Sequence, residues 1–227
     1  MPTSYLSIDT NAKTKKGQAY GYMTGILYFS PADKSGKNLC PHASEGCKAA
    51  CLFTAGRGAQ KKIQLARLRR TLAFLKDRTA FCEAIKNEVS KLIRKANKKG
   101  MIACIRLNGT SDLPWHNIGG IMQSLSTIQF YDYTPNYSRM IQFLSGELPS
   151  NYHLTFSRKE NNDTECLEIL KRGGNVAVVF NSLPTEWNGF PVINGDESDL
   201  RFLDEKGVVV GLKAKGKAKS DKSGFVI

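Results

Sequence analysis

After Gly100 the chain repeats one pattern: a short apolar run, a polar turn and a stretch compatible with helix. Strands that alternate with helices form βαβ units and a mainly parallel sheet. The pattern therefore predicts an α/β fold, either an open sheet or a partial (β/α) barrel, with helices flanking the sheet. Six strands are expected, at Met23–Phe29, Ile102–Leu107, Ile128–Tyr131, Tyr152–Phe156, Asn175–Phe180 and Val208–Leu212.

Two long amphipathic helices are expected between the first two strands, because apolar residues recur there near the helical period. Over Ala59–Lys76 the apolar positions are Ile63, Leu65, Leu68, Leu72 and Leu75. Over Thr79–Asn97 they are Phe81, Ile85, Val89, Leu92 and Ala96, with Thr79 as the expected N-cap. Shorter helices are expected at Leu113–Leu125, Asn136–Leu144 and Asn162–Arg172.

The 227 residues are 41% hydrophobic, enough for a sizeable core, and we expect residues 1–227 to form a single α/β domain. Within it we expect a polar, irregular opening up to about Gly21, a loop over 30–58, basic helices over 59–98 and a flexible Lys-rich tail from about 213 to 227. No apolar run reaches the roughly 20 residues of a membrane span. Met1–Tyr5 lacks a signal-peptide pattern, so a cytoplasmic protein without membrane contact is expected.

The formal net charge of +13 is concentrated in one segment. Residues 54–100 hold 14 of the 33 basic residues but only 3 of the 20 acidic ones. Such a basic surface favours nucleic acid, an acidic protein or an anionic small molecule as a partner. A solvated helical face without a partner explains the same pattern.

Polar residues follow five of the expected strands, where the carboxyl ends of parallel strands share one edge or barrel mouth. We expect these residues to converge and to form a pocket for a small anionic or zwitterionic molecule. The candidate catalytic residues among them are Asn108, Ser111, Asp112, Asp132, Arg158 and Lys213. No Ser-His-Asp order, P-loop or dinucleotide-binding glycine motif supports a common hydrolase, NTPase or dehydrogenase.

Three cysteines lie within one loop, as Cys40, Cys47 and Cys51 with the spacing C-x6-C-x3-C. Clustered thiols in a reducing compartment bind metal more often than they form disulfides. Three local thiolates suit a four-iron cluster ([4Fe-4S]) with one open iron at the C-terminal end of the sheet, where redox or Lewis-acid chemistry on a small molecule would take place.

Other ligand sets for this loop remain open. Zinc is the alternative metal, with His42 as a fourth ligand, although His42 is separated from Cys40 by a single proline. Three small buried hydrophobes without metal are a third interpretation. If the cluster has a protein ligand on its fourth iron, the candidate donors are Asp132, Cys104 and His116.

The remaining cysteines, Cys82, Cys104 and Cys166, are isolated and expected in the core, as is His153. The acidic stretch Asn194–Asp204 suits either a hard-cation site or ion pairs with the basic helices. We favour ion pairs, with Asp199 and Arg201 fixed near the sheet edge.

Two families resemble this chain. The segments Arg106–Asp112, Phe130–Thr134, Asn194–Asp204 and Val208–Gly216 look like the bacteriophage family called gene product 88. That resemblance covers nearly the whole chain and implies a phage protein in the cytoplasm of its bacterial host, where an acidic partner would be a host protein, but it implies no reaction.

The order strand, three-cysteine loop, helix also resembles the radical S-adenosylmethionine enzymes, which hold a four-iron cluster on a (β/α) barrel. S-adenosylmethionine is the cofactor that this second resemblance implies. Those enzymes use C-x3-C-x2-C with an aromatic residue before the last cysteine, whereas here Ala50 precedes Cys51.

Overall fold

A computed structural model describes residues 4–8 and 12–227 of the chain. Its central feature is a nine-stranded sheet with the order β1-β2-β3-β4-β5-β6-β9-β8-β7. Seven of the strands, β2 to β6 with β9 and β8, run parallel, while the edge strands β1 and β7 are antiparallel. The strands are β1 Leu6–Ile8, β2 Tyr22–Leu27, β3 Ile102–Arg106, β4 Gln129–Thr134, β5 Tyr152–Ser157, β6 Val176–Phe180, β7 Glu186–Trp187, β8 Phe190–Asn194 and β9 Val209–Lys213.

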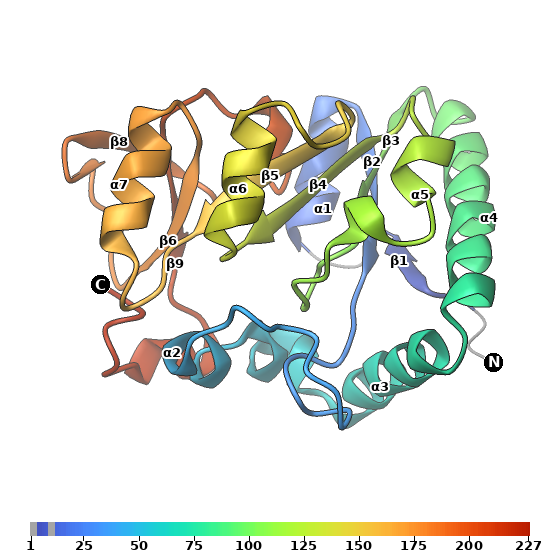
Figure 1. Cartoon of the computed structure of the whole chain (residues 1–227), viewed down its shortest axis with the longest axis horizontal. Coiled ribbons are helices and arrows are strands. Elements are labelled where there is room, and N and C mark those ends of the chain that lie inside the picture. Colours follow the sequence, from blue (N-terminus) through green and yellow to red (C-terminus); the bar gives the residue numbers. More distant parts are fainter. Residues whose placement is uncertain (1–3, 9–11) are drawn as a thin grey trace.

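The order of the parallel strands decides the architecture. Strands β2, β3, β4, β5, β6 and β9 lie side by side in the order in which the chain makes them. Right-handed crossovers that always advance in one direction place their helices on one face, as in a (β/α) barrel. Figure 1 shows α5, α6 and α7 in front of the strands and α1 behind them. The predicted α/β, partial-barrel-like fold is confirmed, and each of the six predicted strands corresponds to an observed one.

The helices are α1 Ala12–Gly17, α2 Glu45–Ala49, α3 Lys61–Lys76, α4 Arg78–Asn97, α5 Ile121–Ser124, α6 Tyr137–Leu144 and α7 Asp163–Lys171. All five apolar positions predicted for α4 are buried. Side chains of α4 pack with alternate strand residues such as Ile105, Phe130 and Leu154 in the main core. The opposite face of the sheet holds a smaller cluster around Tyr131 and Leu200.

The buried face of α3 differs from the predicted one. Arg67, Thr71 and Phe74 are buried, whereas Leu65 and Leu72 are 43% and 50% exposed. The predicted face and the observed face both contain residues spaced by four and then three positions. The tertiary contacts bury the face with the more polar residues. The N-cap of α4 also differs, since Asp77 rather than Thr79 accepts the backbone N–H of Ala80 at 2.9 Å.

The predicted helix over Leu113–Leu125 is broken. It consists of a single 3-10 turn, Trp115–Asn117, and the four-residue α5. Gly119 and Gly120 interrupt it with φ of +63° and +57°, a backbone region that favours glycine. A Cβ at Gly119 would also lie 2.5 Å from the Cys82 sulfur, so the close approach of α4 requires this glycine.

Both ends of the chain are more ordered than their composition suggests. The composition predicts an irregular opening, yet β1 and α1 form there, while residues 1–3 and 9–11 lie outside the described ranges. The Lys-rich C-terminal segment, predicted to be flexible, makes contacts with the sheet. A 3-10 turn spans Gly216–Ser220, Val226 bridges to Val179 of β6, and the backbone N–H of Asn181 donates to the carbonyl of Ile227.

Candidate functional site

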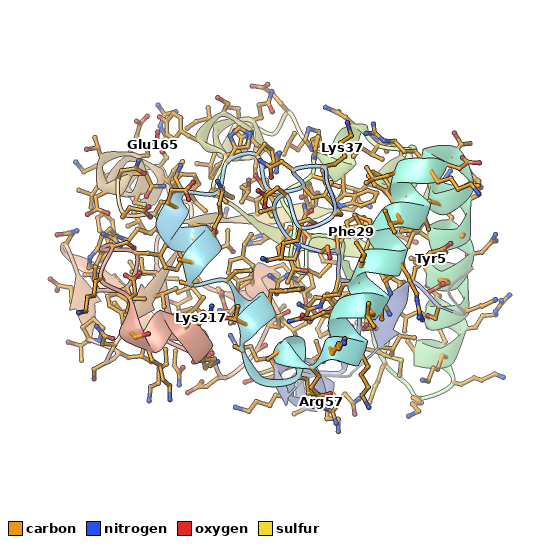
Figure 2. The ribbon with its side chains drawn as sticks, turned by 90° about the horizontal axis from the view of Figure 1, so that it is seen from below. Tyr5, Phe29, Lys37, Arg57, Glu165 and Lys217 are labelled. Atoms are coloured by element: carbon orange, nitrogen blue, oxygen red, sulfur yellow. The ribbon has the colours of Figure 1, made fainter. Side chains whose placement is uncertain are left out.

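The cysteine loop lies across the carboxyl ends of the parallel strands. The backbone N–H of Asp112, after β3, donates to the Leu39 carbonyl at 2.8 Å. Glu160, after β5, binds the start of α2, and Ala50 packs against Ala214 after β9. Figure 2 views the molecule from this side, with the blue loop segments between the C-terminal segment near Lys217 and helix α3. The loop therefore joins polar turns that are far apart in sequence.

Helix α2 carries Cys47, and the Ser44 hydroxyl and the Glu160 carboxylate fix the start of this helix. Ser44 is its N-cap and accepts the backbone N–H of Cys47 at 3.2 Å. Glu160 accepts the Ser44 hydroxyl at 2.5 Å and the Gly46 N–H at 2.9 Å. A Cβ at Gly46 would lie 2.8 Å from the Glu160 carboxylate, so only glycine allows this approach. The backbone of α2 is thereby fixed to the end of β5.

Cys40, Cys47 and Cys51 are free thiols at intermediate burial. Burial raises the pKa of Cys40 to about 11 and of Cys47 to about 12, and it raises the pKa of Cys51 as well. The charge of Cys51 adds to the rise at both other thiols, and Cys40 adds to it at Cys47. The three sulfurs therefore share one electrostatic neighbourhood. Cys40 Sγ also lies 3.3 Å from the backbone N–H of Ala32, a donor to a thiolate.

These thiols are not arranged around a single ion. Among residues 4–8 and 12–227, no three His, Cys, Asp or Glu side chains are gathered closely enough to hold one metal ion. His42, the expected fourth zinc ligand, has its Nε2 2.9 Å from the side-chain amide of Asn136. The described residues around the loop therefore show no preformed site for a single metal ion.

Asp112 is the predicted site residue with the clearest link to the thiols. Its charge contributes to the raised pKa of both Cys40 and Cys47. Oδ1 accepts from Arg139 Nη1 and, at 2.9 Å, from the Thr134 hydroxyl. Oδ2 is buried with no hydrogen-bond partner in the described part of the chain. Burial raises the pKa of Asp112 despite the Arg139 charge.

Asn108, Ser111 and Asp132 form the scaffold of this turn. Asn108 Oδ1 accepts the Ser111 hydroxyl at 2.8 Å and the Leu113 N–H at 2.9 Å. Asp132 accepts the backbone N–H of Asn108 at 2.7 Å and the Tyr152 hydroxyl at 3.1 Å. Burial raises the pKa of Asp132 to about 7. The structure therefore joins Asn108, Ser111 and Asp132 directly, although β3 and β4 provide them separately.

Arg158 and Lys213 have other contacts. Arg158 is buried, with Nε 2.7 Å from Asp163 and Nη1 2.7 Å from the Gly224 carbonyl, so it clamps the C-terminal segment. Lys213 is exposed, and its backbone N–H donates to Asp196 at 3.2 Å. Within the described residues, neither forms a hydrogen bond or ion pair with the cysteine loop.

The candidate donors for a fourth iron lie elsewhere. Cys104 is buried on the face of the sheet opposite to α4, with its sulfur 3.3 Å from the Thr24 hydroxyl. His116 stacks on Tyr152. Cys82 and Cys166 lie in the main core, as expected. His153 is half-buried against Phe143.

Arg67 is a site residue that the sequence pattern did not reveal. Its guanidinium lies 4.9 Å from the Tyr28 ring centre and 5.5 Å from that of Phe53, and its Nε and Nη1 have no hydrogen-bond partner within the described residues. Its charge lowers the pKa of Cys51 against the effect of burial. The sequence does contain a signal for the burial of Arg67. This residue lies four positions after Ile63 and seven before Phe74, on the helix face that packs inward.

The acidic stretch forms ion pairs, but with other partners than α3 and α4. Asp196 pairs with Lys13 of α1 and with Lys215, at 2.8 and 2.6 Å. Asp199 pairs with Arg106 of β3 at 3.2 Å, not with Arg201, which lies beside Asp204. The stretch thus fixes α1 to the sheet.

Most basic side chains near the end of α4 are exposed to solvent. Lys91, Arg94 and Lys95 of α4, with Lys98 just after its end, line one open depression of the surface. None of the helices in the described ranges is long and apolar enough to cross a membrane.

Comparison with protein families agrees with the first resemblance. The family model described as Gene product 88 matches residues 5–227. The chain belongs to the gene product 88 family. No curated protein and no solved structure matches it. These comparisons lend no support to the resemblance between this gene product 88 protein and the radical S-adenosylmethionine enzymes, so that cofactor stays a sequence-based hypothesis.

Proposed function

We propose that this gene product 88 protein is an iron–sulfur protein, with Cys40, Cys47 and Cys51 holding a four-iron cluster at the carboxyl edge of its parallel sheet. The observation that carries the proposal is the convergence of three free thiols from one loop into one electrostatic neighbourhood. A four-iron cluster is larger than one ion, so its cysteines stand farther apart than those on zinc. Three thiolates from one loop are the ligands that such a cluster takes when one of its irons is left open.

The surroundings supply what an anionic cluster needs. Three thiolates on a cluster carry negative charge, and the Arg67 and Lys34 cations lie near enough to lower the pKa of Cys51. The Ala32 N–H at Cys40 is the kind of donor that stabilises cluster sulfurs. When bound, such a cluster supplies electron transfer or Lewis acidity at an open iron. Asp112, whose Oδ2 is buried without a hydrogen-bond partner among the described residues, would hold a proton beside it. The activity that we propose is redox or Lewis-acid chemistry on a small molecule in the host cytoplasm.

Anaerobic purification with iron and sulfide analysis tests this function. We expect brown protein with a broad visible absorption band and equal amounts of iron and sulfide per chain. Cys47→Ala should lose most of both, whereas Cys166→Ala, which removes a buried thiol of the core, should retain them. Colourless protein with one zinc per chain would instead support a zinc-stabilised module.

The basic depression on α4 favours a second candidate function, binding of nucleic acid or an acidic host protein. Contacts to phosphates release counterions, so the logarithm of the binding constant should fall linearly with the logarithm of salt concentration. Lys95→Glu with Lys98→Glu should then abolish binding to duplex DNA in a gel-shift titration. Binding without salt dependence, or unchanged binding of the double variant, would argue against this candidate.

A further inference from the structure

A cavity lies on the face of the sheet opposite to helices α4 to α7. It measures about 170 Å³ and is bordered by residues of the acidic stretch, including Glu197, Leu200, Arg201, Leu203 and Asp204, together with Tyr20. Leu200 packs on Tyr131 there, in the cluster opposite to the main core. None of the three loop cysteines borders this cavity, so a ligand bound in it does not depend on an iron–sulfur cluster.

Two buried charges in its wall are incompletely paired. Arg201 is only 2% exposed, and its Nη1 has no hydrogen-bond partner among the described residues. Its Nη2 donates to the Ser198 carbonyl at 2.8 Å, and its Nε lies 3.2 Å from Asp204 Oδ2 without forming a hydrogen bond. A buried charged group without its full set of partners costs free energy, which a ligand can recover.

The backbone beside Arg201 is shaped for close approach. A Cβ at Gly195 would lie 3.0 Å from Arg201 Nη1 and 2.5 Å from Val210. Lys13 of α1 donates to the Gly195 carbonyl at 2.8 Å and pairs with Asp196, so this turn is held in place. The guanidinium is thus fixed by its neighbours while one of its nitrogens stays unpartnered among the described residues.

We propose that this cavity binds a small zwitterion with an apolar side chain, the chemical class of an apolar α-amino acid. Arg201 Nη1 donates to the carboxylate, and Asp204 Oδ2 accepts from the ammonium group. Burial raises the pKa of Asp204 to about 6, which is still below neutral pH, so the charged form of this carboxyl prevails there. Leu200 and Leu203 contact the apolar side chain.

The charges of the wall exclude other ligand classes. Arg201 is one cation against the two carboxylates of Asp204 and Glu197, so a phosphate or other dianion would be repelled. Arg201 Nη1 and Asp204 Oδ2 are covered by the protein, so a ligand reaches them by displacing part of the cavity wall.

Isothermal titration calorimetry of the full chain with three probes tests the proposal. The probes are L-leucine, N-acetyl-L-leucine, which lacks the cation, and L-leucinamide, which lacks the carboxylate. We expect L-leucine to bind and each derivative to bind at least about ten-fold more weakly, since each loses one charged hydrogen bond. Equal affinity for all three probes, or no binding of L-leucine, would overturn the proposal.

Variants of exposed leucines locate the site without disturbing buried charge. Leu203→Trp should fill the cavity and weaken L-leucine binding by about ten-fold or more. Leu72→Trp, an equally exposed leucine on α3, is the matched control and should bind as the wild type does. Full binding by Leu203→Trp would rule out this cavity as the site.

Discussion

Asp132 is the residue whose ionisation depends most clearly on the fold. It is 1% exposed and accepts from the backbone N–H of Asn108 and the hydroxyl of Tyr152. Burial raises its pKa from 3.8 to about 7, although Arg106 and these hydrogen bonds act in the other direction. The folded chain therefore keeps this proton to a higher pH than the unfolded chain does.

The pH dependence of stability results from that difference. Between about pH 4 and pH 7 the unfolded chain has lost the Asp132 proton and the folded chain has not, so the free energy of unfolding falls as pH rises. The fall is on the order of 4 kcal/mol and ends above pH 7. Asp132→Asn should remove this component in urea unfolding at a series of pH values. An identical pH profile for the variant would contradict the prediction.

Arg67 is a buried cation without a carboxylate partner among the described residues, which is unfavourable in the absence of an anion. We expect Arg67→Met to leave the free energy of unfolding of the metal-free protein within about 1 kcal/mol of wild type, because lost ring contacts and relieved burial of charge offset each other. Iron retained after anaerobic reconstitution should fall several-fold.

Arg69→Met, on the exposed side of α3, is the control and should change neither quantity. A large loss of stability without loss of iron would make Arg67 a structural residue.

At the scale of elements, α2 depends on a contact from outside the cysteine loop. Five residues cannot form a stable helix alone. The Ser44 cap and the Glu160 carboxylate fix its first turn, and through it the position of Cys47. The hydrogen bonds of Glu160 hold its pKa below the usual range although burial acts in the opposite direction, so the anchoring form is the carboxylate.

Glu160→Ala should therefore loosen α2. Loss of a charged hydrogen bond is worth roughly 1.5–3 kcal/mol, so amide hydrogen exchange over Gly46–Cys51 should accelerate by about ten-fold or more. Mass spectrometry of peptic fragments measures it. Glu186→Ala, at an exposed position of β7, should leave this segment unchanged. Unchanged protection in Glu160→Ala would show that other contacts hold α2.

At the scale of the whole molecule, the C-terminal segment closes the carboxyl edge of the sheet. Arg158 donates to the carbonyls of Gly224 and Phe225, and Val226 is 8% exposed beside β6. The same segment packs Ala214 and Ala218 against Ala50 of the cysteine loop. The C-terminal segment and the cysteine loop thus pack against each other at the carboxyl edge of the sheet.

Val226→Asp should lower the free energy of unfolding by about 2–4 kcal/mol, because it buries an unpaired carboxylate. It should also make the cysteine loop more accessible to limited proteolysis. Lys222→Asp, in the exposed part of the same segment, is the control and should stay within about 0.5 kcal/mol of wild type. Wild-type stability of Val226→Asp would mean that the segment is not docked in solution.

The sequence by itself determined the elements with strong local signals. Six of the seven parallel strands are predictable because runs such as Val176–Phe180 are buried on both faces, and α4 is predictable because its apolar positions keep one period from Phe81 to Ala96. The three-cysteine loop is evident from the spacing of its cysteines, and its place after an expected parallel strand predicts its position at the carboxyl edge of the sheet.

Only the tertiary structure decided which side chains meet. Periodicity allows more than one buried face for α3, and packing beneath the cysteine loop selected the face with Arg67. The partner of Asp199 is Arg106, 93 residues earlier, and the C-terminal segment is ordered by Arg158. The cavity at Arg201 likewise arises where distant segments close on one face of the sheet. Local patterns record burial and period, whereas contacts between distant segments depend on the energy of the whole packed chain.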